Sequence, residues 1–144
     1  IRVPLIAYWP GRVKAGSVSD HICAHWDLMP TFCELANITT PKHTDGISYV
    51  PALTGGKQKK HNYLYWEFHS YGNAQAIRMG DWKAIRLKVK NDPNAPIQLY
   101  NLKQDIGETK NIAATHPNVV KRIAPLFKEA HTPSERFPLF AKER

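Results

Sequence analysis

The hydrophobic pattern of the first third of the chain predicts one strand and one helix. Residues 2–9 are apolar on both alternate sets of positions, which is typical of a strand buried on both faces in a parallel sheet. Residues 26–36 repeat apolar side chains at helical spacing, and Asp27 is a candidate N-cap near their start. Asn37 follows this run and can adopt the left-handed conformation that ends a helix.

The second half of the chain changes to a pattern typical of antiparallel strands. Four short runs rich in aromatic and β-branched residues alternate with turn signals, at positions 63–68, 74–79, 82–88 and 97–101. Gly80-Asp81 is the turn signal between the second and third runs. Because the connections are short, we expect a meander of about four antiparallel strands.

A final helix is predicted near the C-terminal end. Apolar residues recur at helical spacing from Val119 to Ala130, and Pro117 fits the first turn of a helix that would cover the open face of the sheet. Pro125 removes a backbone hydrogen bond in the middle of this run, so we expect a kink there. The segment beyond Thr132 contains two further prolines and is expected to be extended.

The chain is basic, with 20 Lys and Arg residues against 12 Asp and Glu residues and a net charge of +8. Two interpretations stay open: a solvated basic surface, or attraction to polyanions such as sulfated glycans or nucleic acid. The basic residues are scattered and accompany no recognised nucleic-acid motif, so we expect no nucleic-acid partner. No apolar run approaches the roughly 20 residues of a membrane span, so no span is expected either.

The two cysteines and a nearby pair of histidines carry weak signals. Cys23 and Cys33 are too few for a disulfide framework. Cys33 lies in the helical pattern and is expected to be buried, while a bridge to Cys23 stays open. His21 and His25 are four residues apart, but no third metal ligand lies at a suitable spacing. We therefore expect no metal site in this chain.

Five segments carry short motifs in a fixed order along almost the whole chain. They are Ile-Arg-Val-Pro-Leu-Ile with Trp-Pro-Gly at 1–11, Ser-Asp-His with Asp-Leu-Met-Pro-Thr at 19–31, Asp-Gly-Ile-Ser at 45–48, Ala-Ile-Arg-Met-Gly-Asp-Trp-Lys at 76–83, and Leu-Tyr-Asn-Leu with Gly-Glu-Thr-Lys-Asn at 99–111. Each motif alone is weak. In this order and spacing they resemble the C-terminal region of the type I, arylsulfatase-like sulfatases, which belong to the alkaline-phosphatase-like superfamily.

This resemblance implies an α+β fold class: a C-terminal sulfatase subdomain with an antiparallel sheet packed by a C-terminal helix, preceded by one strand and one helix of an α/β catalytic domain. We therefore expect residues 1–56 to form the C-terminal end of the α/β catalytic domain. Residues 57–144 would form the antiparallel-sheet subdomain with the final helix. The chain opens directly on the apolar run, so we expect Ile1 to be a boundary within a longer protein.

The resemblance also implies that the parent protein is a sulfuric ester hydrolase. In that family a Cys-x-Pro-x-Arg motif supplies a cysteine that is oxidised to formylglycine, and calcium balances the charge of the sulfate. Neither Cys23 nor Cys33 has a proline two residues later, and the family's acidic metal-binding pair and catalytic lysine have no counterpart here. We expect no catalytic or metal residues in this chain and no activity of the chain alone, while the parent enzyme uses calcium and formylglycine.

His69 and Tyr71 are the candidate substrate-binding residues. They lie in the loop after the aromatic run 63–68, and residues that contact a substrate are often found in such loops between strands. On this interpretation His69 hydrogen-bonds a sugar hydroxyl or a second sulfate. The alternative is an exposed loop histidine without a role.

Three functions stay open, and the third is a purely structural interaction domain, in the case that the parent enzyme is inactive. In the first, the chain is a sulfatase fragment whose partner is the rest of the catalytic domain, and which exposes apolar surface or self-associates when alone. The parent enzyme would then bind a sulfated small molecule or glycan. In the second, the chain is a stand-alone basic module that binds anionic polymers. The family suggests a periplasmic or secreted protein, but the sequence decides neither the compartment nor the sulfate ester.

Overall fold

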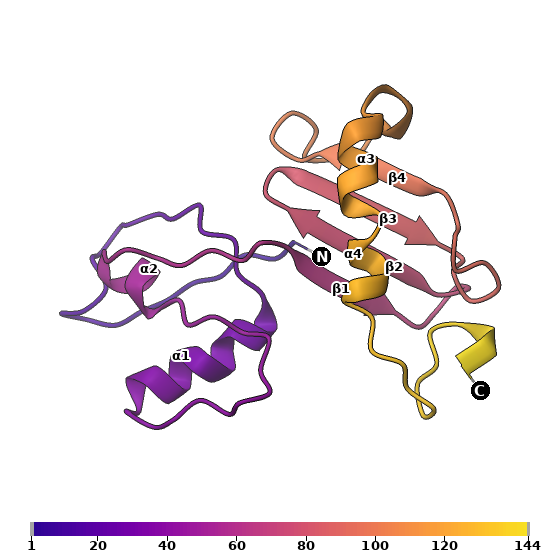
Figure 1. The fold of residues 1–144 in the computed structure, drawn as a ribbon. Coiled ribbons are helices and arrows are strands. Elements are labelled where there is room, and N and C mark those ends of the chain that lie inside the picture. The colour runs from indigo at the N-terminus through magenta and orange to yellow at the C-terminus, as the bar shows by residue number, and fades with distance from the viewer. Residues whose placement is uncertain (1, 144) are drawn as a thin grey trace. The chain divides into compact units, whose positions relative to one another are not determined.

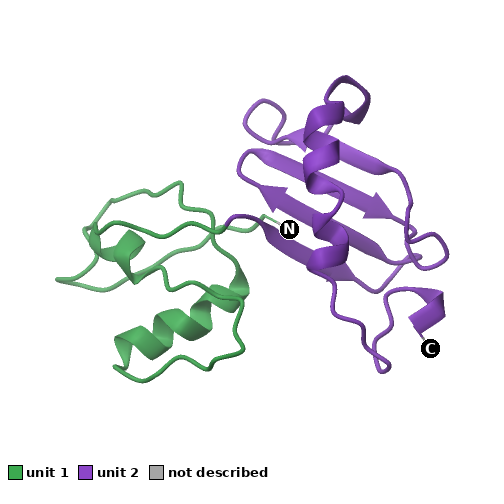
Figure 2. Cartoon of the chain, viewed as in Figure 1, with its two compact units in different colours: residues 1–61 green, residues 62–144 purple. Residues whose placement is uncertain are grey.

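The computed structural model of the chain describes residues 2–143 and has two compact units, residues 1–61 and 62–144 (Figure 2). The sequence-based boundary lies between residues 56 and 57, so residues 57–61 fall in the first unit instead of the second. The role of the first part within a catalytic domain stays a prediction.

The first unit contains two short helices connected by long loops. A 3-10 turn at His25–Asp27 leads into α1 (Leu28–Leu35), and α2 follows at Val50–Thr54. Helix α1 ends as predicted, because Asn37 has a left-handed φ of 55°. The sequence carries no signal for α2, since five residues are too few to establish a helical period.

The predicted strand at residues 2–9 does not form. In the described chain these residues have no strand partner, and Ile6 and Tyr8 are 90% and 89% exposed. A strand buried on both faces needs hydrogen-bonding neighbours and a covering layer on each side, because its backbone groups must be paired. The described part of the first unit supplies neither, so the apolar run lies open to solvent.

The interior of the first unit is small. Cys33 is buried in it, as predicted, and both Cys33 and Cys23 are free thiols, so no bridge joins them. Gly46 lies against the chain just before α1, where a Cβ would come within 2.2 Å of the carbonyl oxygen of Trp26. This approach leaves room for glycine alone at the turn.

The second unit is built on a four-stranded antiparallel sheet, as predicted (Figure 1). Its strands follow chain order and are β1 (Leu64–Phe68), β2 (Ala74–Met79), β3 (Trp82–Leu87) and β4 (Ile97–Asn101). The β2–β3 hairpin pairs Met79 with Trp82 across a two-residue turn. Gly80 in this turn has a left-handed φ of 60°, which glycine adopts without strain.

Two short helices lie across one face of this sheet (Figure 1). They are α3 (Pro117–Ile123) and α4 (Leu126–Glu129), and a 3-10 turn at Ala113–Thr115 precedes them. The kink predicted at Pro125 is a break between two helices, since proline cannot donate the backbone hydrogen bond that would join them. The core between the two layers consists of Ile77, Ala84, Leu99, Ile123 and Phe127, each at most 1% exposed.

The segment after α4 packs against the rest of the second unit and is not simply extended. Leu139 is fully buried with Val89 and Ala95, and a 3-10 turn follows at Ala141–Glu143. The sequence pattern missed this anchor because a single apolar residue sets no period. Among residues 2–143, no helix is long and apolar enough to cross a membrane.

Candidate binding site

His69 and Tyr71, the predicted substrate-binding residues, lie in the loop that joins β1 to β2. The His69 side chain is 37% exposed, and its Nε2 lies 3.6 Å from Oε2 of Glu67. Tyr71 is 94% exposed. Both side chains are accessible to a ligand, and His69 also lies beside the polar side chains that fasten the C-terminal segment.

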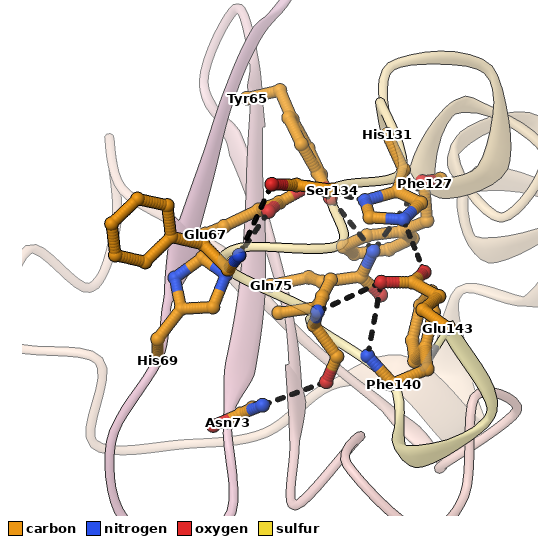
Figure 3. Close-up of polar contacts among 12 residues, drawn as sticks. Tyr65, Glu67, His69, Asn73, Gln75, Phe127, His131, Ser134, Phe140 and Glu143 are labelled. Carbon is orange, nitrogen blue, oxygen red and sulfur yellow. Dashed lines mark hydrogen bonds and ion pairs between the residues drawn. The ribbon is translucent and has the colours of Figure 1, made fainter.

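The backbone of this loop has an unusual conformation. Tyr71, Gly72 and Asn73 are consecutive residues with positive φ angles of 53°, 87° and 63°. For a tyrosine this region costs about 1–3 kcal/mol and persists only where surrounding contacts fix it. One such contact comes from the buried Asn73, whose Nδ2 donates to the carbonyl oxygen of Leu139 at 2.7 Å (Figure 3).

Three ionisable side chains from distant parts of the unit meet beside His69 (Figure 3). His131, which follows α4, has its Nδ1 2.6 Å from Oε1 of Glu67 on β1. The other ring nitrogen, Nε2, lies 2.5 Å from Oε1 of Glu143 in the C-terminal turn. Alternation along the strand puts Tyr65 and Glu67 on one face of β1, which brings Glu67 toward the segment that leaves α4.

Glu143 fastens the C-terminal turn to this cluster. Its Oε2 accepts the backbone N–H groups of Leu139 at 2.9 Å and Phe140 at 3.4 Å. Burial opposes the charged carboxylate, but the hydrogen bonds from His131 and from these two N–H groups outweigh it and lower the pKa of Glu143. Glu143 is therefore a charged acceptor over most of the accessible pH range.

His131 is the central group of the cluster and is 9% exposed. Burial alone disfavours its protonated form. The hydrogen bonds and negative charges of Glu67 and Glu143 outweigh burial and raise the pKa of His131 above its ordinary value of 6.5. Because the protonated ring has a donor on each nitrogen, it matches two carboxylate acceptors at once.

Tyr65 and Gln75 extend the cluster toward Phe127 of α4 (Figure 3). The Tyr65 hydroxyl donates to Oε1 of Glu67 at 2.7 Å and accepts from Nε2 of Gln75 at 2.7 Å. Burial, and after it the hydrogen bond to Glu67, raises the pKa of Tyr65, so the phenol stays neutral. Gln75 is 2% exposed and also reaches the carbonyl oxygen of Phe127 at 3.4 Å. The cluster thus joins β1, β2, α4 and the C-terminal turn.

A hollow of about 220 Å³ opens next to this cluster. His69 lines it together with Lys90 and Arg136, and no carboxylate is among its lining residues in the part of the chain that the structure describes. Tyr71 lies outside the lining. The structure therefore places His69 at a cavity and leaves Tyr71 on the exposed tip of the same loop.

Sequence reasoning missed most of this arrangement. Glu67 had a usable signal, because it lies two positions before His69 in a strand whose alternate residues share a face. His131, Glu143 and Arg136 come from irregular segments, where no hydrophobic period indicates which way a side chain points.

Asp27 is a second buried carboxylate and belongs to the first unit, where it is 1% exposed. It occupies the predicted N-cap position of α1, but its backbone is helical and its side chain makes no capping hydrogen bond to that helix. Instead, Oδ2 accepts the N–H of Ala24 at 2.7 Å, while Oδ1 accepts the N–H of Ile47 at 2.8 Å and lies 2.8 Å from Nε2 of His61. Asp27 thereby joins three loops of the unit.

The described residues do not fit the cofactors that the family resemblance implies. Within residues 2–143, no group of three or more His, Cys, Asp or Glu side chains is placed to hold a metal ion. Burial, together with the charge of Asp27, raises the pKa of the Cys23 thiol, and Cys33 is buried in the core. The described residues therefore offer no such group of side chains for calcium, and neither cysteine lies in a Cys-x-Pro-x-Arg motif.

Comparison with known proteins accounts for the shared motifs. Residues 1–132 match the family described as N-sulphoglucosamine sulphohydrolase, C-terminal. The chain belongs to this family. The resemblance to the C-terminal region of a sulfatase is thus confirmed, and the five motif segments at residues 1–111 lie within the matched range.

Curated relatives of this chain are considerably longer than it is. A delta 4,5-hexuronate-2-O-sulfatase of Bacteroides thetaiotaomicron is 36% identical over 119 residues, which cover 77% of this chain and 24% of that protein. An N-acetylgalactosamine-6-sulfatase of Canis lupus familiaris is 30% identical over 146 residues, covering 96% of this chain and 26% of that protein. The chain spans about a quarter of the length of these relatives.

Solved structures confirm the α+β sulfatase C-terminal fold. One, a protein in complex with its substrate D-glucosamine-2-N,6-O-disulfate, matches with a TM-score of 0.71 and 27% identity over 85% of this chain and 26% of that one. A second, a 2-O GAG sulfatase, matches with a TM-score of 0.62 and 33% identity over 72% of this chain and 23% of that one.

Proposed function

We propose that this chain is the C-terminal part of a sulfatase that hydrolyses sulfate esters. The observation that carries the proposal is the family match over residues 1–132, and the names of the relatives, which are sulfatases, support it. The nucleophile and the calcium ligands would come from the remaining three quarters of such a protein, and this part completes its fold. The chain alone is inactive.

The first unit packs against the rest of the catalytic domain in this proposal. Its helix α1 exposes Met29 and Phe32 at 54% and 60%, and Trp26 and Leu28 line an adjoining hollow of about 510 Å³. A contiguous apolar surface of this kind marks an interaction site in a soluble protein. The exposed run at residues 2–9 would gain its missing strand partners from the same domain.

The second unit contributes a wall of the substrate pocket through His69, with Tyr71 on the same loop. The strained backbone at Tyr71 supports this role, because such strain is concentrated at functional sites. The disulfated glucosamine bound in the solved structure noted above supports a sulfated sugar as the class of substrate. His69 would hydrogen-bond a hydroxyl or a second sulfate of that sugar.

The test replaces His69→Asn in the full-length protein that contains this chain and measures hydrolysis of a sulfated monosaccharide. Loss of one hydrogen bond to a charged or polar substrate group should raise KM roughly tenfold. Ser70→Ala, an exposed neighbour in the same loop, is the control and should leave KM unchanged. An unchanged KM in His69→Asn would remove the pocket-wall role, and absence of sulfate release from the unmodified protein would remove the sulfatase proposal itself.

A further inference from the structure

The hollow beside His69 has three walls from separate segments of the second unit. The β1–β2 loop contributes His69, the turn after β3 contributes Lys90, and the C-terminal segment contributes Arg136, Phe137 and Phe140. Its volume of about 220 Å³ lies below the roughly 300–1,000 Å³ of sites for drug-sized molecules, so it suits one small ring with its substituent.

Two hydrogen bonds between backbone groups and one from a side chain hold these walls together. The N–H of Ala141 donates to the carbonyl oxygen of Lys90 at 2.7 Å, and the N–H of Lys90 donates to that of Gly72 at 3.0 Å. Asn73 closes the remaining side through its bond to the carbonyl oxygen of Leu139. Because the walls are fixed before a ligand arrives, binding costs little ordering entropy.

The charge of the hollow favours an anion. Lys90 and Arg136 bring two positive charges to the lining, and His69 adds a further hydrogen-bonding ring. The nearby acids are already engaged, because Glu143 bonds His131 and two backbone N–H groups, while Glu67 bonds His131 through Oε1 and its Oε2 lies 3.6 Å from Nε2 of His69. The positive charges of Lys90 and Arg136 are therefore only partly offset.

The aromatic lining favours a ring next to that anion. Phe137 is 66% exposed, and Phe140 is half-buried and fixed edge-on against His131 with the ring centroids 5.0 Å apart. Phenyl groups at a small site supply apolar contact area, while a few charged groups fix the orientation of the ligand.

We propose that this hollow binds an anionic group, a sulfate or a carboxylate, carried on a single sugar ring. Arg136 pairs with the anion through its planar guanidinium, Lys90 adds a second charge, and the ring lies against Phe137. The proposal rests on the proposed function in using His69 and a sugar ligand, but it adds Lys90 and Arg136 as the groups that select the charge.

The test titrates the whole 144-residue chain with N-acetylglucosamine 6-sulfate, with glucuronate and with uncharged N-acetylglucosamine, followed by calorimetry. Saturable binding of either anionic sugar, at least about tenfold tighter than that of the neutral sugar, is expected, and the two anionic arms identify the preferred group. Arg136→Gln and Lys90→Gln should each weaken that binding roughly ten- to hundredfold. The hydrogen bonds of residue 90 to Gly72 and Ala141 are made by its backbone, so neither substitution removes them and the walls remain in place.

Lys121→Gln is the matched control, because Lys121 is exposed on α3 and does not line the hollow. Equal weakening in this variant, equal affinity for the neutral sugar, or unchanged binding in Arg136→Gln and Lys90→Gln would each overturn the proposal. Sulfate ester hydrolysis is not the readout here. A chain that fails this titration therefore leaves the sulfatase proposal, and its test on KM, standing.

Discussion

The two units of this molecule use their apolar residues in opposite ways. In the second unit the sheet and the helices α3 and α4 enclose Ile77 and Phe127, which are at most 1% exposed. In the first unit Ile6 and Phe32 are 90% and 60% exposed, and the polar side chains Asp27 and Thr31 are each only 1% exposed. The second unit thus has a hydrophobic core of its own, whereas the loops of the first unit are joined by polar contacts and its apolar surface stays exposed.

The largest expected effect is in the hydrophobic core. Phe127→Ala should lower the free energy of unfolding of the second unit by about 3–5 kcal/mol, because it removes a buried aromatic ring and leaves a cavity. The Arg86 guanidinium over this ring, 4.8 Å from its centroid, would lose its partner too. Urea unfolding followed by circular dichroism measures the change. Phe137→Ala, at a 66% exposed site, is the control and should lower the free energy of unfolding by less than about 0.5 kcal/mol. Equal losses in the two variants would contradict the assignment of Phe127 to the core.

The next effect is in the first unit. Asp27→Ala should destabilise the loops around α1 by about 2–3 kcal/mol, since the N–H groups of Ala24 and Ile47 lose their acceptor. Hydrogen exchange at these two amides should accelerate, while amides of the β-sheet keep their protection. Asp45→Ala, at an exposed position, is the control. Faster exchange in the sheet as well would show that the two units unfold together.

A smaller effect concerns pH and the cluster around His131. The pKa of His131 is raised in the folded chain, so its contribution to stability is fully present below 6.5 and is lost as the pH rises through the folded value. The pKa of Glu143 is lowered, so its contribution is present above 4.5 and is lost as the pH falls through the folded value. The cluster should therefore stabilise the second unit most between about pH 4.5 and pH 6.5.

His131→Gln tests this pH dependence. The substitution should lower the free energy of unfolding by about 1–2 kcal/mol near pH 6, because Glu67 and Glu143 lose a charged partner. It should also make the loss of stability above pH 6 less steep. Thermal unfolding at a series of pH values gives both quantities. His116→Gln, at the start of α3 and beside Trp82, is the control, and the pH dependence of its stability should match that of the unmodified chain. A slope that survives in His131→Gln would assign the pH dependence to other groups.

The smallest effect on stability, and a clear effect on association, is expected at the surface of the first unit. Phe32→Lys changes a side chain that is already 60% exposed, so the free energy of unfolding should shift by less than about 0.5 kcal/mol. If the exposed apolar face drives self-association of the chain, this charge should reduce it. Sedimentation velocity over a range of concentrations measures the change, and a chain that is monomeric before the substitution would refute the expectation.

The sequence predicted the second unit far better than the first. Its strands alternate within short runs, and its final helices carry a helical period interrupted by one proline, so local pattern and final structure agree. The strand expected at residues 2–9 has the composition of a buried strand, but its burial depends on neighbours that the described chain does not supply. Pattern alone cannot distinguish a strand from a segment with the same composition and no partner.

The candidate site was predictable only in part. His69 was identified because a polar residue after an aromatic strand lies in a loop, and the structure does place it at a hollow. Its neighbours there, Lys90 and Arg136, follow β3 and α4 at unrelated positions in the sequence. Their proximity depends on bonds such as that between Asn73 and Leu139, which span 66 residues and leave no local signature.

The position of Glu143 bears on where a shortened version of this chain can end. The family match ends at residue 132, one position after His131, so a domain cut there keeps the imidazole and discards its second carboxylate. The same cut removes Leu139 and uncovers Val89, which it buries. A recombinant version that ends at residue 132 would thus lack the contacts that Leu139 and Glu143 make with the rest of the second unit. Extending it by eleven residues, to residue 143, restores them.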